Sequence, residues 1–308
     1  MEYRSLGTSG LQVSEIGLGT NNFGNRIDEA TCRGIVDECL ELGVNFIDTA
    51  DIYGQGQSES TLGRILDGRR GEVVLATKFG MQMGEDSRYR RGASRRWITQ
   101  AVEDSLRRLN TDYIDLYQVH TPDSGTPIVE TLQAMDDLVR QGKVRYIGHS
   151  NFAAYQAVDA DWTARTEHLA RPISSQLYYN LLHREIEAEA MPACWEFGLG
   201  VIPFFPLESG FLTGKYSRES TPEGARLADG PRRSSVLTDE NFARLEALEA
   251  FARERDHTLL ELALGWLLSH DEVSSVIAGA SSAAQVRQNV EASSWRLDAA
   301  EMEAVGAL

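Results

Sequence analysis

Short apolar runs alternate with longer amphipathic stretches along most of the chain. Eight apolar runs have the length and the content of Val, Ile and Leu that predict buried strands: Ile16–Gly19, Phe46–Asp48, Val73–Thr77, Ile114–His120, Val144–Ser150, Ser174–Tyr178, Val201–Phe205 and Ser275–Ala278. Helical periodicity predicts helices between and after them: Asp28–Leu42, Ser58–Leu66, Arg95–Leu109, Ile128–Gln141, Ala153–Thr166, Ile186–Phe197, Thr258–Ser269 and Ala283–Glu291. This alternation is typical of βα units around a parallel sheet.

Three further segments complete the predicted architecture. The run Leu6-Gly7-Thr8-Ser9-Gly10-Leu11 places turn residues between two apolar flanks and predicts a short N-terminal β-hairpin. The stretches Asp239–Glu254 and Asp298–Leu308 predict extra helices near the C-terminus. Because no break in composition divides residues 1–308, we expect an α/β fold made of a single (β/α)8 TIM barrel domain.

A doubly wound parallel sheet is the alternative fold. Its phosphate-binding loop, Gly-x-Gly-x-x-Gly, is missing after the first predicted strand, where Gly17-Leu18-Gly19 alone is a weak signal. The sequence therefore favours the barrel.

The composition narrows the class of protein. Acidic residues number 46 against 30 basic ones, which gives a net charge of −16 and argues against general binding to nucleic acids or to anionic membranes. One small anionic ligand in a locally positive pocket stays compatible with this charge. Three cysteines without CxxC spacing, no apolar leader at the N-terminus and no run of ~18 apolar residues predict a reduced, cytoplasmic protein.

Polar residues collect where predicted strands end. Asp48 ends the second strand and Tyr53 follows five residues later, Lys78 follows the third strand, and His120 ends the fourth. Each residue alone is unremarkable, since a lysine after a strand is usually solvated. In a closed parallel barrel, however, all these strand ends share one mouth, so their coincidence predicts a catalytic site.

The chemistry of this set is proton transfer to a polarised oxygen. A phenol with a pKa near 10 is a poor acid at neutral pH, whereas a neighbouring ammonium is expected to lower that pKa and a carboxylate to hold the ammonium in place. A histidine can hydrogen-bond the same substrate oxygen. The chain has no Gly-x-Ser-x-Gly nucleophile motif and no clustered His and Cys residues, so we expect neither a serine hydrolase nor a metal site.

At these residues the chain resembles the aldo-keto reductase family. The matching segments, in the family's order and spacing, are NFIDTADIYG at 45–54, ATK at 76–78, DLYQVHTPD at 115–123, GKVRYIGHSNF at 142–152, QLYYNLL at 176–182 and PLESGFLTGKY at 206–216. The resemblance implies a barrel that binds a nicotinamide dinucleotide in extended form, with NADPH or NADP+ expected and NADH possible. It also implies a small carbonyl or alcohol substrate.

The resemblance assigns a role to each candidate residue. Tyr53 would be the general acid and base, Lys78 and Asp48 would tune it, and His120 would orient the carbonyl. Ser150, Asn151 and Gln176 would hold the nicotinamide carboxamide, Phe204 would stack on the ring, and residues 206–215 would follow the pyrophosphate. The full set of expected cofactor-binding residues is Gly19, Thr20, Asn21, Ser150, Asn151, Gln176, Phe204, Pro206, Leu207, Ser209, Gly210, Leu212, Gly214, Lys215, Gly279, Ser281, Gln285, Gln288 and Asn289.

Two departures from the family pattern affect cofactor binding. Phe205 stands where many relatives carry serine. Ser281 and Gln285 stand where relatives often place basic residues on the adenosine 2′-phosphate, and their uncharged groups bind phosphate less strongly than arginine. Arg287 is close in sequence but should point away from Gln285 on a helix. The sequence is therefore compatible with appreciable use of NADH beside the NADPH that the resemblance implies.

The expected substrate side of the pocket comprises Phe23, Tyr53, the connection 81–96 and the loop after His120, which suggests a hydrophobic or mixed carbonyl compound. The arginines in the first of these connections, Arg88, Arg90 and Arg91, are expected to be solvated. Two other functions stay open: a dinucleotide-binding regulatory subunit with little turnover, and a lyase using Lys78 as a Schiff-base amine. The second conflicts with an Asp48 partner that keeps the amine protonated. No oligomeric state is predicted.

Overall fold

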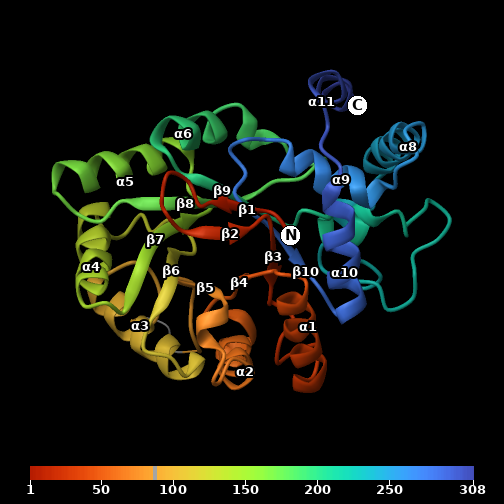
Figure 1. Ribbon diagram of the computed structural model, residues 1–308. Coiled ribbons are helices and arrows are strands. Elements are labelled where there is room, and N and C mark those ends of the chain that lie inside the picture. Colours follow the sequence, from red (N-terminus) through yellow and green to blue (C-terminus); the bar gives the residue numbers. More distant parts are fainter. Residues whose placement is uncertain (86–88) are drawn as a thin grey trace.

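The computed structural model describes residues 1–85 and 89–308, and its centre is an eight-stranded parallel sheet (Figure 1). The strands are β3 (Ile16–Gly19), β4 (Phe46–Asp48), β5 (Val74–Phe79), β6 (Ile114–Val119), β7 (Val144–Ser150), β8 (Pro172–Tyr178), β9 (Gly200–Phe204) and β10 (Val276–Gly279). Their spatial order is β10-β3-β4-β5-β6-β7-β8-β9. The sheet closes because the backbone N–H of Val201 donates to Glu272 O at 2.9 Å and that of Ser274 donates to Val201 O at 2.9 Å. The predicted (β/α)8 barrel is thus confirmed.

A hairpin plugs the amino-terminal end of the barrel. Strands β1 (Tyr3–Ser5) and β2 (Gln12–Ser14) pair antiparallel, as predicted, and lie across the centre of the view in Figure 1. Leu6 and Val13 are completely buried against barrel-interior side chains that include Phe46, Leu116 and Ile202. This end of the barrel is therefore sealed, and the carboxyl ends of the strands form the other end.

Helices surround the sheet. They are α1 (Glu29–Glu41), α2 (Gln57–Ile65), α3 (Arg95–Leu109), α4 (Ile128–Arg140), α5 (Ala154–Thr166), α6 (Ala190–Phe197), α7 (Arg233–Val236), α8 (Asp239–Arg253), α9 (Leu259–Leu268), α10 (Ala283–Glu291) and α11 (Ala299–Gly306). Helix α3 illustrates the local causes: Ser94 caps its first turn by accepting from the N–H of Trp97, and Asn110 ends it in the left-handed conformation. Between these caps, the buried residues repeat at helical spacing and face the barrel.

One predicted helix begins later than expected. The sequence predicts a helix from Ile186, but residues Glu185–Glu187 form a separate 3-10 turn and α6 starts at Ala190. This start places Pro192 within the first helical turn, where its missing N–H costs no intrahelical hydrogen bond. Glu187 also accepts hydrogen bonds from Tyr179 and Arg184, which ties the preceding turn to the barrel.

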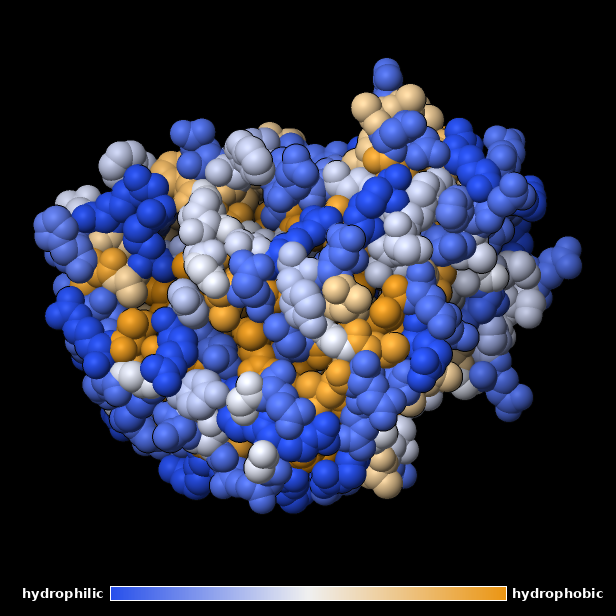
Figure 2. Space-filling view, in the orientation of Figure 1, coloured by the Kyte–Doolittle hydropathy of each residue, from blue (hydrophilic) through white to orange (hydrophobic). Residues whose placement is uncertain are grey.

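The C-terminal part adds helices outside the repeating pattern. Helices α8 and α11 confirm the two extra helices, whereas the four-residue α7 was not predicted. In the space-filling view, hydrophilic residues dominate the rim of the face shown, and hydrophobic residues become visible toward its centre (Figure 2). None of the helices within the described residues has the length and apolar content needed to cross a bilayer.

Candidate active site

A cavity of about 1260 Å³ opens at the carboxyl ends of the barrel strands. It is larger than the roughly 300–1,000 Å³ typical of small-molecule sites. Its walls come from the connection after β3, from the ends of most strands, from residues 204–215, from residues 224–226 and from α10. The cavity therefore has room for a ligand longer than one ring system.

The four predicted catalytic side chains meet at the bottom of this cavity. The ammonium of Lys78 donates to Asp48 Oδ2 at 2.5 Å and to the carbonyl of Thr49 at 2.9 Å, and its Nζ lies 3.5 Å from the hydroxyl of Tyr53. The rings of Tyr53 and His120 are in edge-to-face contact with centroids 6.0 Å apart. The expected convergence of strand ends thus brings these four residues together.

Local backbone geometry sets the positions of two of these groups. The sequence analysis placed Lys78 directly after a strand, but the residue lies inside β5, and its side chain is completely buried. Tyr53 begins a tight turn in which Gly54 and Gln55 have φ values of 58° and 55°. Left-handed conformations are rare for residues other than glycine and persist where surrounding contacts enforce them. This turn directs the phenol back toward the strand ends.

The structure corrects one expectation about Tyr53. Burial raises the pKa of its phenol, and the opposing effect of the Lys78 ammonium does not cancel that increase, so the pKa lies above its ordinary value. For Lys78, burial acts to lower the pKa, but the neighbouring Asp48 and Tyr53 outweigh it and the pKa is raised. At neutral pH the phenol therefore carries its proton and the amine its charge.

His120 is held in its neutral form. Burial, followed by the charge of Lys78, lowers the pKa of His120 to about 3. Its Nδ1 atom is buried without a hydrogen-bond partner among the described residues, while its backbone carbonyl accepts from Asn151 Nδ2 at 3.0 Å. A neutral imidazole can donate one N–H to a substrate oxygen without repelling the adjacent ammonium.

Side-chain amides hold the carboxylate of this set. Gln176 Nε2 donates to Asp48 Oδ1 at 2.9 Å, and Gln118 Nε2 approaches the same oxygen at 3.4 Å. Gln118 was missed by the sequence analysis, although it lies near the end of β6, two residues before His120, where side chains alternate in direction with a period of two. Ser150 Oγ donates to the backbone carbonyl of Gln176 at 2.9 Å. No donor among the described residues is recorded for the amide oxygen of Gln176, so this atom can accept from a ligand.

Most of the expected cofactor-binding residues line the cavity. Those found there are Gly19, Thr20, Asn21, Ser150, Asn151, Gln176, Phe204, Pro206, Leu207, Ser209, Gly210, Lys215, Gly279, Ser281, Gln285, Gln288 and Asn289. Leu212 and Gly214 are not among the lining residues: Leu212 is completely buried in the apolar core, and Gly214 turns the chain with φ of 79°. The 3-10 turn from Glu208 to Thr213 causes this inward rotation of the leucine.

The expected substrate side needs one correction. Phe23 is completely buried in the core between the barrel and its helices and does not line the cavity. Met81 and Thr121 do line it, which places the start of the connection 81–96 and the loop after His120 at the mouth. Arg90 and Arg91 are exposed, and Arg88 lies outside the described residues.

Three cations line the cavity, two of which the sequence analysis did not single out. They are Arg26, Lys215 and Arg226, and none of them has a carboxylate within 4 Å among the described residues. Burial lowers the pKa of Lys215. It also lowers the pKa of Arg226, and the nearby charges of Arg26 and Arg232 lower it further. The only signal for Arg226 was its place in a long connection after a strand. These uncompensated charges fit an anionic ligand such as a dinucleotide.

The wall of the cavity at α10 is polar and has no cation among its lining residues, although the carboxylate of Glu291 belongs to it. Ser281 donates to Gln285 Oε1 through its backbone N–H at 2.8 Å and its hydroxyl at 3.1 Å. Arg287 instead forms an ion pair with Glu38 of α1 and does not line the cavity, as its place on the helix suggested. The groups expected to meet the adenosine end therefore include no arginine from α10.

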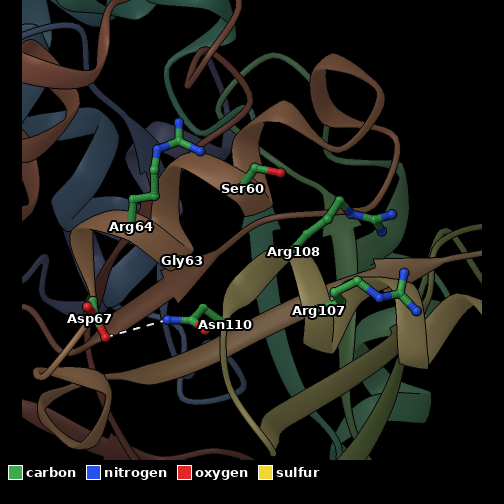
Figure 3. Close-up of a pocket in the computed structure, with 7 residues that line it drawn as sticks. All are labelled: Ser60, Gly63, Arg64, Asp67, Arg107, Arg108 and Asn110. Atoms are coloured by element: carbon green, nitrogen blue, oxygen red, sulfur yellow. Dashed lines mark hydrogen bonds between the residues drawn. The ribbon is translucent and has the colours of Figure 1, made fainter.

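A second, smaller hollow of about 500 Å³ lies on the outside, between α2 and α3 (Figure 3). It also carries three cations, Arg64, Arg107 and Arg108. Each guanidinium already has a carboxylate: Arg64 pairs with Glu29, Arg107 with Asp104 and Arg108 with Glu59, at 2.7–2.8 Å. Asp67, whose Oδ1 accepts from Asn110 Nδ2 at 3.5 Å, adds a negative charge to the lining. Within the described residues, this hollow therefore offers no uncompensated cation to an anionic ligand.

Comparison with known proteins agrees with the geometry. Residues 15–308 match the model of the Aldo/keto reductase family. The chain is 38% identical to the "Uncharacterized oxidoreductase YrpG" of Bacillus subtilis, over 97% of this chain and 93% of the relative. It is 34% identical to the "Aldo-keto reductase YhdN" of the same organism, over 100% and 93%. It is also 36% identical to a "Probable voltage-gated potassium channel subunit beta" of Oryza sativa, over 95% and 91%. The chain therefore belongs to the aldo-keto reductase family of oxidoreductases.

Proposed function

We propose that this protein reduces aldehydes or ketones to alcohols, and catalyses the reverse reaction, with NADPH as the hydride donor. The observation that carries the proposal is the buried Asp48–Lys78 ion pair, whose ammonium lies 3.5 Å from a protonated Tyr53 at the base of a large cavity. A bound nicotinamide would supply the hydride. The residues of the chain supply the proton and the orientation.

Proton transfer is the role of Tyr53. When negative charge develops on a carbonyl oxygen, the phenol can donate its proton, and the adjacent Lys78 ammonium stabilises the phenolate that forms. Asp48 holds that ammonium charged within the barrel, where an unpaired amine would lose its proton. Neutral His120 can donate a hydrogen bond to the same oxygen and thereby fix its position.

The rest of the cavity would hold the dinucleotide. Gln176 and Asn151 offer amide groups for a carboxamide near the catalytic residues. Arg26, Lys215 and Arg226 supply positive charge for the phosphates, and Gly210 leaves space, because a Cβ there would come within 2.9 Å of the lysine Nζ. Without arginine at the adenosine end, we propose that NADPH is preferred over NADH only moderately.

The experiment is a panel of aldehydes and ketones assayed for NADPH and NADH consumption, with the alcohol product identified. The proposal expects steady turnover and transfer of deuterium from the labelled nicotinamide to the product carbon. Tight dinucleotide binding without turnover on any member of the panel would contradict it.

A second candidate is a dinucleotide-binding regulatory subunit. The name of the rice relative favours it, since that protein is described as a channel subunit. It predicts slow or absent turnover and a stable complex with a partner protein. Steady turnover at ordinary enzyme rates would leave this alternative unsupported.

A further inference from the structure

A buried acidic compartment lies behind the catalytic residues, on the side of β5 that faces α2 and α3. Thr77 precedes Lys78 on β5, and its hydroxyl donates to Glu59 Oε1 of α2 at 2.6 Å. The other oxygen, Glu59 Oε2, accepts from Arg108 Nε of α3 at 2.7 Å. Glu59 is completely buried, and both of its oxygens have a donor. The compartment therefore already holds one carboxylate together with its cation.

Asp51, two residues before Tyr53, enters the same compartment without a recorded partner for its carboxyl group. The residue is 1% exposed, and neither of its carboxyl oxygens has a hydrogen-bond partner among the described residues. An ionised carboxylate withdrawn from water is stable only where donors or a cation satisfy it. Because Arg108 already pairs with Glu59, the geometry favours a carboxyl group that keeps its proton.

The charges that act on Asp51 come from three surrounding elements. Glu59 of α2 opposes its ionisation, whereas Arg108 of α3 and Lys78 of β5 favour it. Burial raises the pKa of Asp51 to about 8, with Glu59 as the next cause. Tyr117 of β6 lies close enough to be affected in turn, since burial and then the charge of Asp51 raise its pKa. Asp51 is therefore neutral in most molecules at pH 7 and charged in most at pH 9.

Backbone hydrogen bonds connect Asp51 with the catalytic lysine. The N–H of Asp51 donates to the carbonyl of Lys78 at 3.1 Å. The ammonium of the same lysine donates to the carbonyl of Thr49 at 2.9 Å. Segment 49–53 thus contacts Lys78 at both its backbone and its side chain, and Tyr53 is the last residue of this segment. A movement of Asp51 would therefore displace the groups that transfer the proton.

We propose that Asp51 is a positioning residue whose neutral form supports proton donation by Tyr53 and whose ionised form slows it. The inference rests on the proposed function for the reaction. Two physical effects act in the same direction. A second negative charge near the site makes the phenolate harder to form. A buried carboxylate without donors also favours movement toward water, which disturbs segment 49–53 and with it the phenol.

The interval between pH 7 and pH 9 isolates this effect. The pKa values of Tyr53 and Lys78 are raised above their ordinary values of 10.0 and 10.5, and the pKa of His120 is lowered to about 3. None of these three groups changes its charge in that interval. A loss of rate between pH 7 and pH 9 that disappears with the Asp51 carboxyl group therefore reports on Asp51.

The first measurement is the single-turnover rate of NADPH oxidation with a carbonyl substrate at pH 7 and at pH 9. The wild-type rate should fall by roughly five- to ten-fold, since about nine tenths of a group is ionised one pH unit above its pKa. In Asp51→Asn the rate should change by less than about two-fold, because the amide resembles the neutral acid and does not titrate. Asp159→Asn, at an exposed position of α5, is the matched control and should behave as the wild type does. Equal falls in the wild type and in Asp51→Asn would contradict the inference, as would a wild-type rate that does not fall.

The second measurement needs neither ligand nor turnover. A carboxyl group whose pKa is about 8 in the native state and about 3.9 in the unfolded chain binds an extra proton in the native state between these values, so its stabilising contribution is lost as the pH rises. Urea unfolding should therefore show Asp51→Asn becoming more stable relative to the wild type from pH 5 to pH 8. The difference between Asp159→Asn and the wild type should stay constant. A constant difference for Asp51→Asn as well would show that the carboxyl group is ionised in the native protein and would overturn the inference.

The two measurements separate failure of the inference from failure of the proposed function. If the wild type reduces carbonyl compounds but Asp51→Asn keeps the fall in rate, the proposed function stands and only the role of Asp51 is wrong. If the wild type oxidises NADPH with no carbonyl compound, the proposed function is wrong, and the role of Asp51 in proton donation is wrong with it.

Discussion

Two hollows of this molecule each carry three cationic side chains, yet their electrostatic situations are opposite. In the outer hollow between α2 and α3, every guanidinium has a carboxylate within 2.8 Å. In the barrel cavity, no carboxylate of the described residues lies within 4 Å of the three lining cations, and burial lowers the pKa of two of them. The number of arginines around a hollow therefore says little; what counts is whether their charges are already neutralised.

This difference is informative because the chain as a whole is acidic. With a net charge of −16, carboxylates are abundant, and an isolated group of cations is an exception to the general surface. Keeping charges partly buried and close to like charges is unfavourable while the cavity holds no anion: burial first, and the charges of Arg26 and Arg232 second, lower the pKa of Arg226. An anionic ligand removes that cost, so the barrel cavity gains affinity from an arrangement that would otherwise destabilise the fold.

The largest expected effect concerns proton donation by Tyr53, for which the outer hollow has no counterpart among its lining residues. Tyr53→Phe removes the acidic proton and keeps the ring, so carbonyl reduction should fall by about 10²–10⁴-fold while NADPH binding is retained. Steady-state rates and fluorescence titration measure the two quantities. Tyr89→Phe, at an exposed position, is the control. Retention of most activity in Tyr53→Phe would contradict the assignment of the general acid.

The next effect tests the cations themselves. Lys215→Met and Arg226→Met should each weaken NADPH binding by about 10–100-fold, the range expected for losing a charge-assisted hydrogen bond, and the loss should shrink at high salt. Arg107→Met in the outer hollow should leave NADPH binding unchanged. Titrations at two salt concentrations compare the three variants. Equal effects from both hollows would remove the distinction between paired and unpaired cations.

A pH-dependent effect separates the buried histidines from the outer hollow. Burial lowers the pKa of His149 to about 3, as it does for His120, whereas a histidine in an unfolded chain titrates near 6.5. Below pH 6.5 these two histidines bind protons in the unfolded chain but stay neutral in the native state. The free energy of unfolding should therefore fall as the pH drops from about 6.5 toward 3.

The variant His149→Asn isolates one of these contributions. The difference in free energy of unfolding between pH 7.5 and pH 5.0 should be smaller than in the wild type by about 2 kcal/mol, measured by urea unfolding. Arg107→Met should leave that difference as it is, because arginine does not titrate in this range. An unaltered pH dependence in His149→Asn would show that this imidazole is not held neutral.

The barrel and its catalytic corner could be predicted because both follow from periodicity and from strand ends. Asp48 and His120 lie at or next to the last residue of their strands, and parallel strands must bring such ends together. The aromatic Phe23 was misplaced because apolar residues in a loop can face a cavity or the core, and only packing decides between them. Phe23 enters the core because the chain folds back from Asn22 to Ile27.

Three features of the structure could not be predicted from the sequence: the raised pKa of Tyr53, the place of Arg226 in the cavity wall and the ion pair of Glu208 with Arg232. Each depends on contacts between segments far apart in the chain, whose burial and separation no local pattern encodes. Burial outweighs the lysine at Tyr53. Glu208 finds its cation 24 residues away, on a connection without regular periodicity.

The smallest expected effect concerns the free energy of unfolding and compares two ion pairs of the outer hollow. Arg107 is 71% exposed and pairs with Asp104 of its own helix, so Arg107→Met should change the free energy of unfolding by no more than about 0.5 kcal/mol. Arg108 pairs with Glu59, whose side chain is completely buried, and its removal would leave that carboxylate without its cation. Urea unfolding of the two variants should therefore show a clear loss for Arg108→Met and almost none for Arg107→Met. Equal losses would mean that burial of the acid does not determine how much an ion pair stabilises this protein, and the same argument would then lose its force for Asp48 of β4.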